Sequence, residues 1–142
     1  MPCAVGSGFE LTSVGLDNEN KDSKNTGFFT IAKKKESLSK AFNCIIVPLK
    51  EIIDGISKNN EKIIFAKIDV EGMESVILKE LFEEIKRIGY RFPIKYEVNP
   101  KYMNLKEIKN NERLSIENNF RVFYEYENQV GQKTTDAFLI PK

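Results

Sequence analysis

The chain has 142 residues, of which 41% are hydrophobic and 30% are charged, a composition that suits one globular domain with a single core. Its 22 lysines and arginines almost balance its 21 aspartates and glutamates, so a basic surface for nucleic acid or an anionic membrane is not expected. The sequence contains no histidine, which excludes Ser-His-Asp and Cys-His catalysis and all histidine-ligated metals. Proton transfer would therefore fall to carboxylates, lysines or tyrosines.

The sequence also bears on the compartment. It contains no apolar stretch long enough to span a bilayer, and its first residues lack the basic and apolar regions of a signal peptide. Cys3 and Cys44 lie far apart and form no CxxC motif, so neither a disulfide framework nor a zinc site is expected. These features predict a cytoplasmic protein.

Residues 1–43 form the least regular part of the chain. Turn-forming residues separate two short expected strands, Phe9–Val14 and Gly27–Ile31. Gly6-Ser7-Gly8 lacks the preceding buried strand and the following helix of a phosphate-binding loop, so a turn is expected there.

Stronger patterns begin at Cys44. We expect a strand over Cys44–Leu49 that ends near Pro48, and a short helix with apolar residues from Leu49 to Ile56. Ile63–Val70 is an apolar run interrupted by Lys67 and, near its end, by Asp69, and it predicts a strand buried on both faces in a parallel sheet covered by helices. Lys67 is expected to pair with a carboxylate.

The rest of the chain alternates between helical and extended patterns. The expected elements are a long helix over Met73–Ile88 closed by Gly89, a strand over Ile94–Val98, a weaker helix from Leu105 towards Asn119, and strands over Phe120–Glu127 and Ala137–Ile140. The loop between the last two strands is too short for a crossover, so these strands must be antiparallel. The pattern predicts an α/β fold whose mostly parallel sheet ends in an antiparallel hairpin.

One motif lies where such a sheet would bind a ligand. Asp69, Glu71 and Gly72 follow the apolar run directly and precede the long helix, at the carboxyl end of the expected strand. The string Lys67-Ile68-Asp69-Val70-Glu71-Gly72, followed by Glu74 and Val76-Ile77-Leu78, resembles the signature of the FkbM-type methyltransferases. Val47–Asp54 is similar to the family's segment that leads into the signature strand, Tyr96–Pro100 to its next strand, which ends in a glutamate, and Asp136–Ile140 to its last strand.

The resemblance implies a Rossmann-like class I methyltransferase domain that depends on S-adenosyl-L-methionine and methylates a hydroxyl group of a sugar or other metabolite. Residues 1–142 would form one partial domain, with a variable region at 1–43 and the C-terminal α/β half at 44–142. By the same resemblance Asp69, Glu71 and Glu97 are candidate catalytic residues, and Asp69 and Gly72 are candidate cofactor-binding residues. No metal is expected, because the Asp69 and Glu71 pair has no identifiable third ligand.

The sequence departs from that family in one respect. Family members begin with a glycine-rich D-x-G-A-N-x-G loop that cradles the cofactor and with a second strand that ends in F-E-P, and neither string occurs here. The N-terminal strands of the sheet are therefore expected to be missing, and the Ile63–Val70 strand should have an open edge. The Phe9–Val14 segment, a partner chain (including a second copy) or an upstream part of the gene product are the candidates to cover it.

Two simpler interpretations stay open. Acidic residues before a helix stabilise it through the dipole by about 0.3–1 kcal/mol each, which would account for Asp69 and Glu71 without a ligand, and Gly72 would then serve only a turn. At the level of function, the alternative to a methyltransferase is a non-catalytic remnant that binds a glycan or a protein partner.

Overall fold

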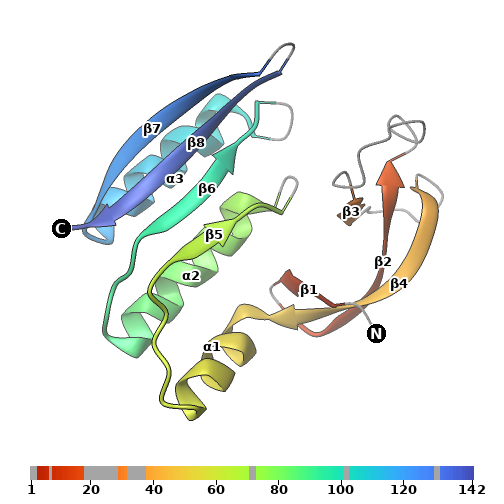
Figure 1. Cartoon of the computed structure of the whole chain (residues 1–142), viewed down its shortest axis with the longest axis horizontal. Coiled ribbons are helices and arrows are strands. Elements are labelled where there is room, and N and C mark those ends of the chain that lie inside the picture. The colour runs from red at the N-terminus through yellow and green to blue at the C-terminus, as the bar shows by residue number, and fades with distance from the viewer. Residues whose placement is uncertain are drawn as a thin grey trace. The chain divides into compact units, whose positions relative to one another are not determined.

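The computed structural model describes residues 3–6, 8–17, 29–31, 38–70, 73–100, 103–129 and 132–142. The chain divides into two compact units, Met1–Glu51 and Ile52–Lys142. Each unit contains a mixed sheet of four strands, and the described residues also form three helices (Figure 1). The expected α/β class is confirmed. None of the helices in the described ranges is long and apolar enough to cross a membrane.

The first unit consists of strands in the order β1-β4-β2-β3. Their bounds are Cys3–Gly6 for β1, Glu10–Asp17 for β2, Phe29–Ile31 for β3 and Leu38–Pro48 for β4. β1 is parallel to β4, and β2 is antiparallel to both β4 and β3. β2, which contains most of the Phe9–Val14 segment, has a strand neighbour on each side in its own sheet, so among the described residues this segment does not pair with the second sheet.

The strand expected to start at Cys44 is longer than its apolar run. β4 begins at Leu38 and ends at Pro48, and helix α1, Leu49–Lys58, follows at once. Proline lacks the N–H group that a strand ladder needs, which explains why the strand stops there. The expected strand over Gly27–Ile31 corresponds to β3, although residues 27–28 lie outside the described residues, as does Ser7 of the expected turn.

The second unit has the strand order β5-β6-β8-β7. After α1 its elements are β5 (Ala66–Ile68), α2 (Glu74–Ile88), β6 (Ile94–Val98), α3 (Leu105–Glu117), β7 (Phe120–Gln129) and β8 (Gln132–Pro141). β5 and β6 are parallel, whereas β8 lies between β6 and β7 and is antiparallel to both. The expected antiparallel hairpin is therefore present, but the sheet is mixed rather than mostly parallel, because the last strand inserts into it.

Local sequence accounts for the two long helices. The apolar stripe of α2 is buried at Ile77, Leu78, Leu81, Phe82 and Ile85. This helix ends where Gly89 adopts a left-handed φ of 77°, the conformation that glycine permits without strain.

Helix α3 starts with a capping box. The Asn104 side chain accepts hydrogen bonds from the backbone N–H groups of Lys106 and Glu107, and the Glu107 side chain accepts one from the Asn104 backbone. After the helix Asn119 has a positive φ of 65°, as its sequence position predicts.

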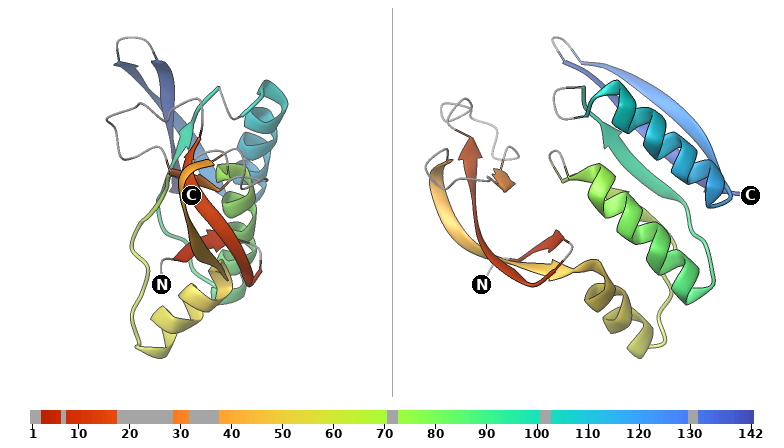
Figure 2. Two further views of the ribbon diagram at one scale, coloured as in Figure 1. Left: turned by 90° about the vertical axis from the view of Figure 1, so that its right-hand side faces the viewer. Right: turned by 180° about the vertical axis from the view of Figure 1, so that it is seen from behind.

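Helices α2 and α3 lie on the same face of the second sheet (Figure 2). The side chains that point towards them are fully or almost fully buried, namely Ile68, Ile94, Tyr96, Val98, Phe120, Ala137 and Leu139. Alternate residues point the other way, to a surface that we call the outer face and that carries Lys67, Lys95, Glu97, Phe123, Asp136 and Phe138.

The expectation that Ile63–Val70 is a strand buried on both faces was wrong. Only Ala66–Ile68 pairs as a strand, and it lies at the edge of the sheet. Ile64 is 84% exposed and Phe65 is 48% exposed. Hydrophobic residues are thus not a sufficient sign of burial here, because only one face of this strand is covered by helices.

Candidate functional site

The candidate site begins at the carboxyl end of β5. Ile68 is buried towards the helices, so its neighbours Lys67 and Asp69 lie on the opposite side of the chain and are exposed. The structure therefore places Asp69 on the rim of the sheet, between β5 and the start of α2. Glu71 and Gly72, the other candidates in this motif, lie outside the described residues.

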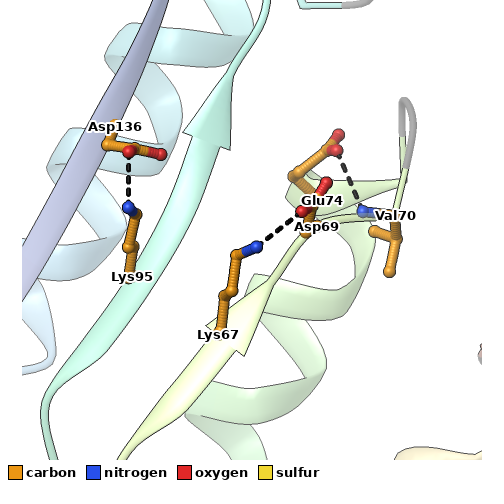
Figure 3. Close-up of polar contacts among 6 residues, drawn as sticks. All are labelled: Lys67, Asp69, Val70, Glu74, Lys95 and Asp136. Carbon is orange, nitrogen blue, oxygen red and sulfur yellow. Dashed lines mark hydrogen bonds and ion pairs between the residues drawn. The ribbon is translucent and has the colours of Figure 1, made fainter. Parts of the chain in front are cut away.

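Lys67 and Asp69 form an ion pair. The Lys67 Nζ atom donates a hydrogen bond of 2.8 Å to Asp69 Oδ2 (Figure 3), which confirms the expectation that Lys67 pairs with a carboxylate. This hydrogen bond and the Asp69 charge raise the pKa of Lys67 above its usual 10.5. Because both side chains are about half exposed, the pair contributes little to stability, and its effect is to orient the Asp69 carboxylate.

Glu97 lies on the neighbouring strand at the level of Asp69. Lys67 is in register with Lys95, and Ile68 with Tyr96, so the next residues along the two parallel strands are Asp69 and Glu97. Glu97 is half-buried. The register therefore brings together two of the three carboxylates predicted as catalytic.

Two further acidic residues lie at the same level on the next two strands of the sheet. Glu97 lies opposite Asp136 on β8, and Asp136 lies opposite Glu125 on β7. We call Asp69, Glu97, Asp136 and Glu125 the acidic row. Like charges that lie directly opposite each other across strands destabilise a sheet, so such a row needs nearby cations.

Lys67 and Lys95 supply these cations. Lys95 Nζ lies 2.5 Å from Asp136 Oδ2 (Figure 3). The same nitrogen lies 5.2 Å from the centre of the Phe138 ring. The charges of Lys95 and Asp136 also act on the pKa of Lys67, the first lowering it and the second raising it, after the larger effects of Asp69 and desolvation. The two lysines and the acidic row thus form one electrostatic cluster on the outer face.

This cluster suits a ligand with hydroxyl groups or a positive charge. Carboxylates accept hydrogen bonds from hydroxyls and stabilise a nearby cation. Within the described ranges, no three histidine, cysteine, aspartate or glutamate side chains are grouped so that they could hold a metal ion. The cationic sulfur of S-adenosylmethionine fits the charge of the cluster, whereas the glycine-rich loop that would cradle the rest of the cofactor has no counterpart in the sequence.

Glu74, which received no site role from the sequence, is buried in this region. It is the first residue of α2 and is only 2% exposed. Its Oε1 atom accepts a hydrogen bond of 3.3 Å from the Val70 backbone N–H (Figure 3). Its position in the first turn of a helix, just after the motif that contains Asp69, is the signal in the sequence that could have indicated this contact.

A pocket of about 270 Å³ lies elsewhere in the second unit. It is lined by Ile85, Lys86, Gly89, Tyr90, Arg91 and Asn118, around the C-terminal ends of α2 and α3. None of the residues predicted as functional lines it. Since open α/β sheets bind ligands at the carboxyl ends of their strands, the Asp69 end remains the better candidate.

Comparison with known proteins adds no relative: no protein-family model matches the chain, and no match was found among curated proteins or among solved structures. A functional proposal for this chain therefore depends on its own residues and their geometry.

Proposed function

We propose that the chain is the later part of an FkbM-type O-methyltransferase domain, which depends on S-adenosylmethionine and acts on a hydroxyl group of a sugar or other metabolite. The observation that carries the proposal is the parallel register of β5 and β6, which pairs Ile68 with Tyr96 and, when continued by one residue, brings Asp69 level with Glu97. Ligands of open α/β sheets bind at this edge.

The topology of the second unit supports the proposal. Its strand order is β5-β6-β8-β7, with the last strand of the chain inserted antiparallel between its two neighbours. This order is compatible with the C-terminal half of a Rossmann-like methyltransferase sheet. The signature string also falls at the β5–α2 junction, where the resemblance requires it.

In the proposed reaction, these residues would bind and orient the cofactor and the acceptor. S-adenosylmethionine, when bound, supplies a methyl group on a positively charged sulfur. Asp69, with Gly72, would hold the cofactor, and Glu71 and Glu97 would orient the acceptor hydroxyl, so that alignment supplies much of the rate enhancement. A carboxylate of this group would accept the hydroxyl proton of the acceptor, while the hydrogen bond from Lys67 would orient Asp69.

Binding of S-adenosylhomocysteine to the full chain, measured by isothermal titration calorimetry, tests the proposal. We expect a dissociation constant below about 1 mM, or roughly −4 kcal/mol, because only part of the expected cofactor site is present. Asp69→Asn should weaken binding about tenfold, since it removes a charge-assisted contact of about 1.5–3 kcal/mol. Glu117→Gln, on the exposed surface of α3 and outside the acidic row, is the control and should leave the affinity unchanged.

The absence of heat at millimolar ligand would contradict the proposal and favour the second candidate, a non-catalytic remnant that binds a glycan or a protein partner. Two observations favour that candidate: the sequence lacks the glycine-rich string, and the outer face presents an aromatic side chain, Phe123, that is 53% exposed. Aromatic faces can pack against sugar rings. A titration with oligosaccharides, followed by NMR at the Phe123 ring, would detect such binding.

A further inference from the structure

Glu74 is a buried carboxylate whose burial needs an explanation. It is the first residue of α2, and with Asn111 and Ser115 it is one of three buried polar side chains in the described part of the chain. Burial of an ionised carboxylate is costly unless hydrogen bonds compensate it. A residue that serves only solubility or helix propensity would lie on the exposed side of α2.

The contact that Glu74 makes lies next to the candidate site. Its Oε1 atom accepts the hydrogen bond from the N–H group of Val70, the residue directly after Asp69. Met73, at the N-cap position of α2, contributes no side-chain cap. The Glu74 side chain therefore bridges the two sides of the turn that connects β5 to α2.

We propose that Glu74 is a positioning residue, which fixes the peptide plane between Asp69 and Val70 and thereby holds the backbone from which the Asp69 side chain projects. The Val70 N–H group belongs to the same planar unit as the Asp69 carbonyl group, so a hydrogen bond to it restricts the ψ angle of Asp69. The Lys67 ion pair holds the Asp69 carboxylate itself. One contact thus holds the backbone at Asp69, and the other holds its side chain.

The consequence for ligand binding rests on the proposed function. A carboxylate that is already oriented pays less conformational entropy when a ligand binds, so its contact contributes more to the affinity. Loss of the Glu74 contact should therefore weaken binding of S-adenosylhomocysteine even though Glu74 does not touch the ligand.

A competing explanation is that Glu74 only stabilises α2 through the helix dipole, since a negative charge in the first turn is favourable. The two explanations require different atoms. The dipole effect needs the charge, whereas the contact with Val70 needs an acceptor oxygen at the end of the side chain. Glu74→Gln keeps the oxygen and removes the charge, and Glu74→Ala removes both.

The first measurement does not depend on a ligand. In the full chain, NMR would follow hydrogen exchange of the Val70 amide and the carboxyl ¹³C shift of Asp69. We expect Glu74→Ala to speed Val70 exchange by about tenfold or more and to move the Asp69 signal, while Glu74→Gln leaves both close to the wild-type values. Asn111→Ala is the control, because it removes another buried polar side chain, whose hydrogen bonds go to Ser75 and Met103 and not to Val70.

The second measurement is the affinity for S-adenosylhomocysteine in the same variants. We expect about a tenfold loss in Glu74→Ala, with rescue in Glu74→Gln and little change in Asn111→Ala. Unchanged Val70 exchange in Glu74→Ala, or equal effects of Glu74→Ala and Asn111→Ala on the Asp69 signal, would overturn the proposal. If the wild-type chain does not bind the ligand, the proposed function fails, and the exchange and ¹³C measurements still decide the role of Glu74.

Discussion

The side chain of Tyr96 is well packed, but its buried hydroxyl group lacks a hydrogen bond in the described part of the chain. Its ring is fully buried between the sheet and the helices, and its hydroxyl has no hydrogen-bond partner among the described residues. Exclusion of water raises the pKa of Tyr96 far above its usual 10.0, and the nearby Tyr124 and Glu112 act in the same direction. This burial makes Tyr96 a packing residue of the core.

Substitution Tyr96→Phe should therefore stabilise the protein. It removes a buried hydroxyl whose lost hydration costs about 1–3 kcal/mol, and it keeps the packed ring, so we expect a gain of about 1 kcal/mol. Urea unfolding at pH 7, followed by circular dichroism at the helix band, would measure this gain in stability. The helices of the described residues lie between Leu49 and Glu117, on both sides of Tyr96 in the sequence, so their signal reports on this part of the fold. Tyr124→Phe is the control and should give no gain, since Tyr124 does have an interaction partner.

Glu80 on α2 provides a pH-dependent prediction. Desolvation and the neighbouring charge of Glu84 raise the pKa of Glu80 above its usual 4.5. A raised carboxyl pKa means that stability is fully present below the unfolded-state value and decreases as the pH rises through the folded-state value. We therefore expect Glu80→Gln to be slightly stabilising at pH 7, by less than about 0.5 kcal/mol after solvent screening, and neutral at pH 3.

The control for that prediction lies one turn further along α2. Glu83 pairs with Lys86 on the helix surface, so Glu83→Gln should be slightly destabilising at pH 7 instead. Denaturant unfolding at the two pH values distinguishes these cases. A gain for Glu80→Gln that persists at pH 3 would show that its cause is not ionisation.

Among the helices, the backbone conformation of a glycine distinguishes a position inside a helix from a position that ends one. Two glycines of the second unit show the difference. Gly55 lies inside α1, and Gly89 follows α2 with a φ of 77°. A Cβ atom added at either position would meet no atom within 4 Å. The effect of an alanine at the two positions should therefore differ only because their backbone conformations differ.

The same substitution should accordingly have opposite effects at the two glycines. Gly55→Ala should stabilise the protein by about 0.5–1 kcal/mol, because alanine loses less backbone freedom in a helix. Gly89→Ala should destabilise it by about 1 kcal/mol, because alanine is strained at positive φ. Thermal or urea unfolding of the two variants measures the difference, and a change of equal sign in both would contradict the assigned ends of α1 and α2.

For the molecule as a whole, the edge of the second sheet at β5 matters, because no other strand of the described residues pairs with β5 on that side. β5 is the first strand in the sheet order, and β6 is its neighbour on the inner side. The residues that lead into β5 include Ile64 and Phe65, both exposed. An unpaired strand edge flanked by exposed apolar side chains favours association with another strand.

We therefore expect the chain to associate in a concentration-dependent way, and Ile64→Lys to reduce this association. A lysine at the edge places a charge where a second strand would pair. Leu105→Lys is the matched control, since Leu105 is 75% exposed but lies on α3 and not at the edge. Sedimentation velocity over a range of concentrations would measure the effect, and equal behaviour of the two variants would show that general hydrophobicity, not the edge, drives association.

Much of the fold could be predicted because its signals are local. The end of α2 at Gly89, the positive φ of Asn119 and the antiparallel pairing of the last two strands follow from a few neighbouring residues each, and all are confirmed. The burial of β5 could not be predicted in the same way. Whether an apolar run is covered depends on which elements pack against each face, and the run Ile63–Val70 is covered on one face only.

Part of the candidate site could also be predicted from local sequence, and part could not. Asp69 could be placed at the end of a strand from its sequence context, and Lys67 could be expected to pair with a carboxylate. The acidic row could not be found, since Glu97, Asp136 and Glu125 are distant in sequence and meet only through the register of β6, β8 and β7.

The order of the elements, the limits of the helices and the chemical character of the β5–α2 junction could therefore be derived from the sequence alone. The spacing of hydrophobic residues and the positions of glycine and proline set these features within a few residues. Only the tertiary structure decided which carboxylates share a level of the sheet, that Glu74 turns inward to Val70, and that Ile64 and Phe65 stay exposed. These features depend on strand insertion and on the coverage of each face, which are set by contacts between segments far apart along the chain.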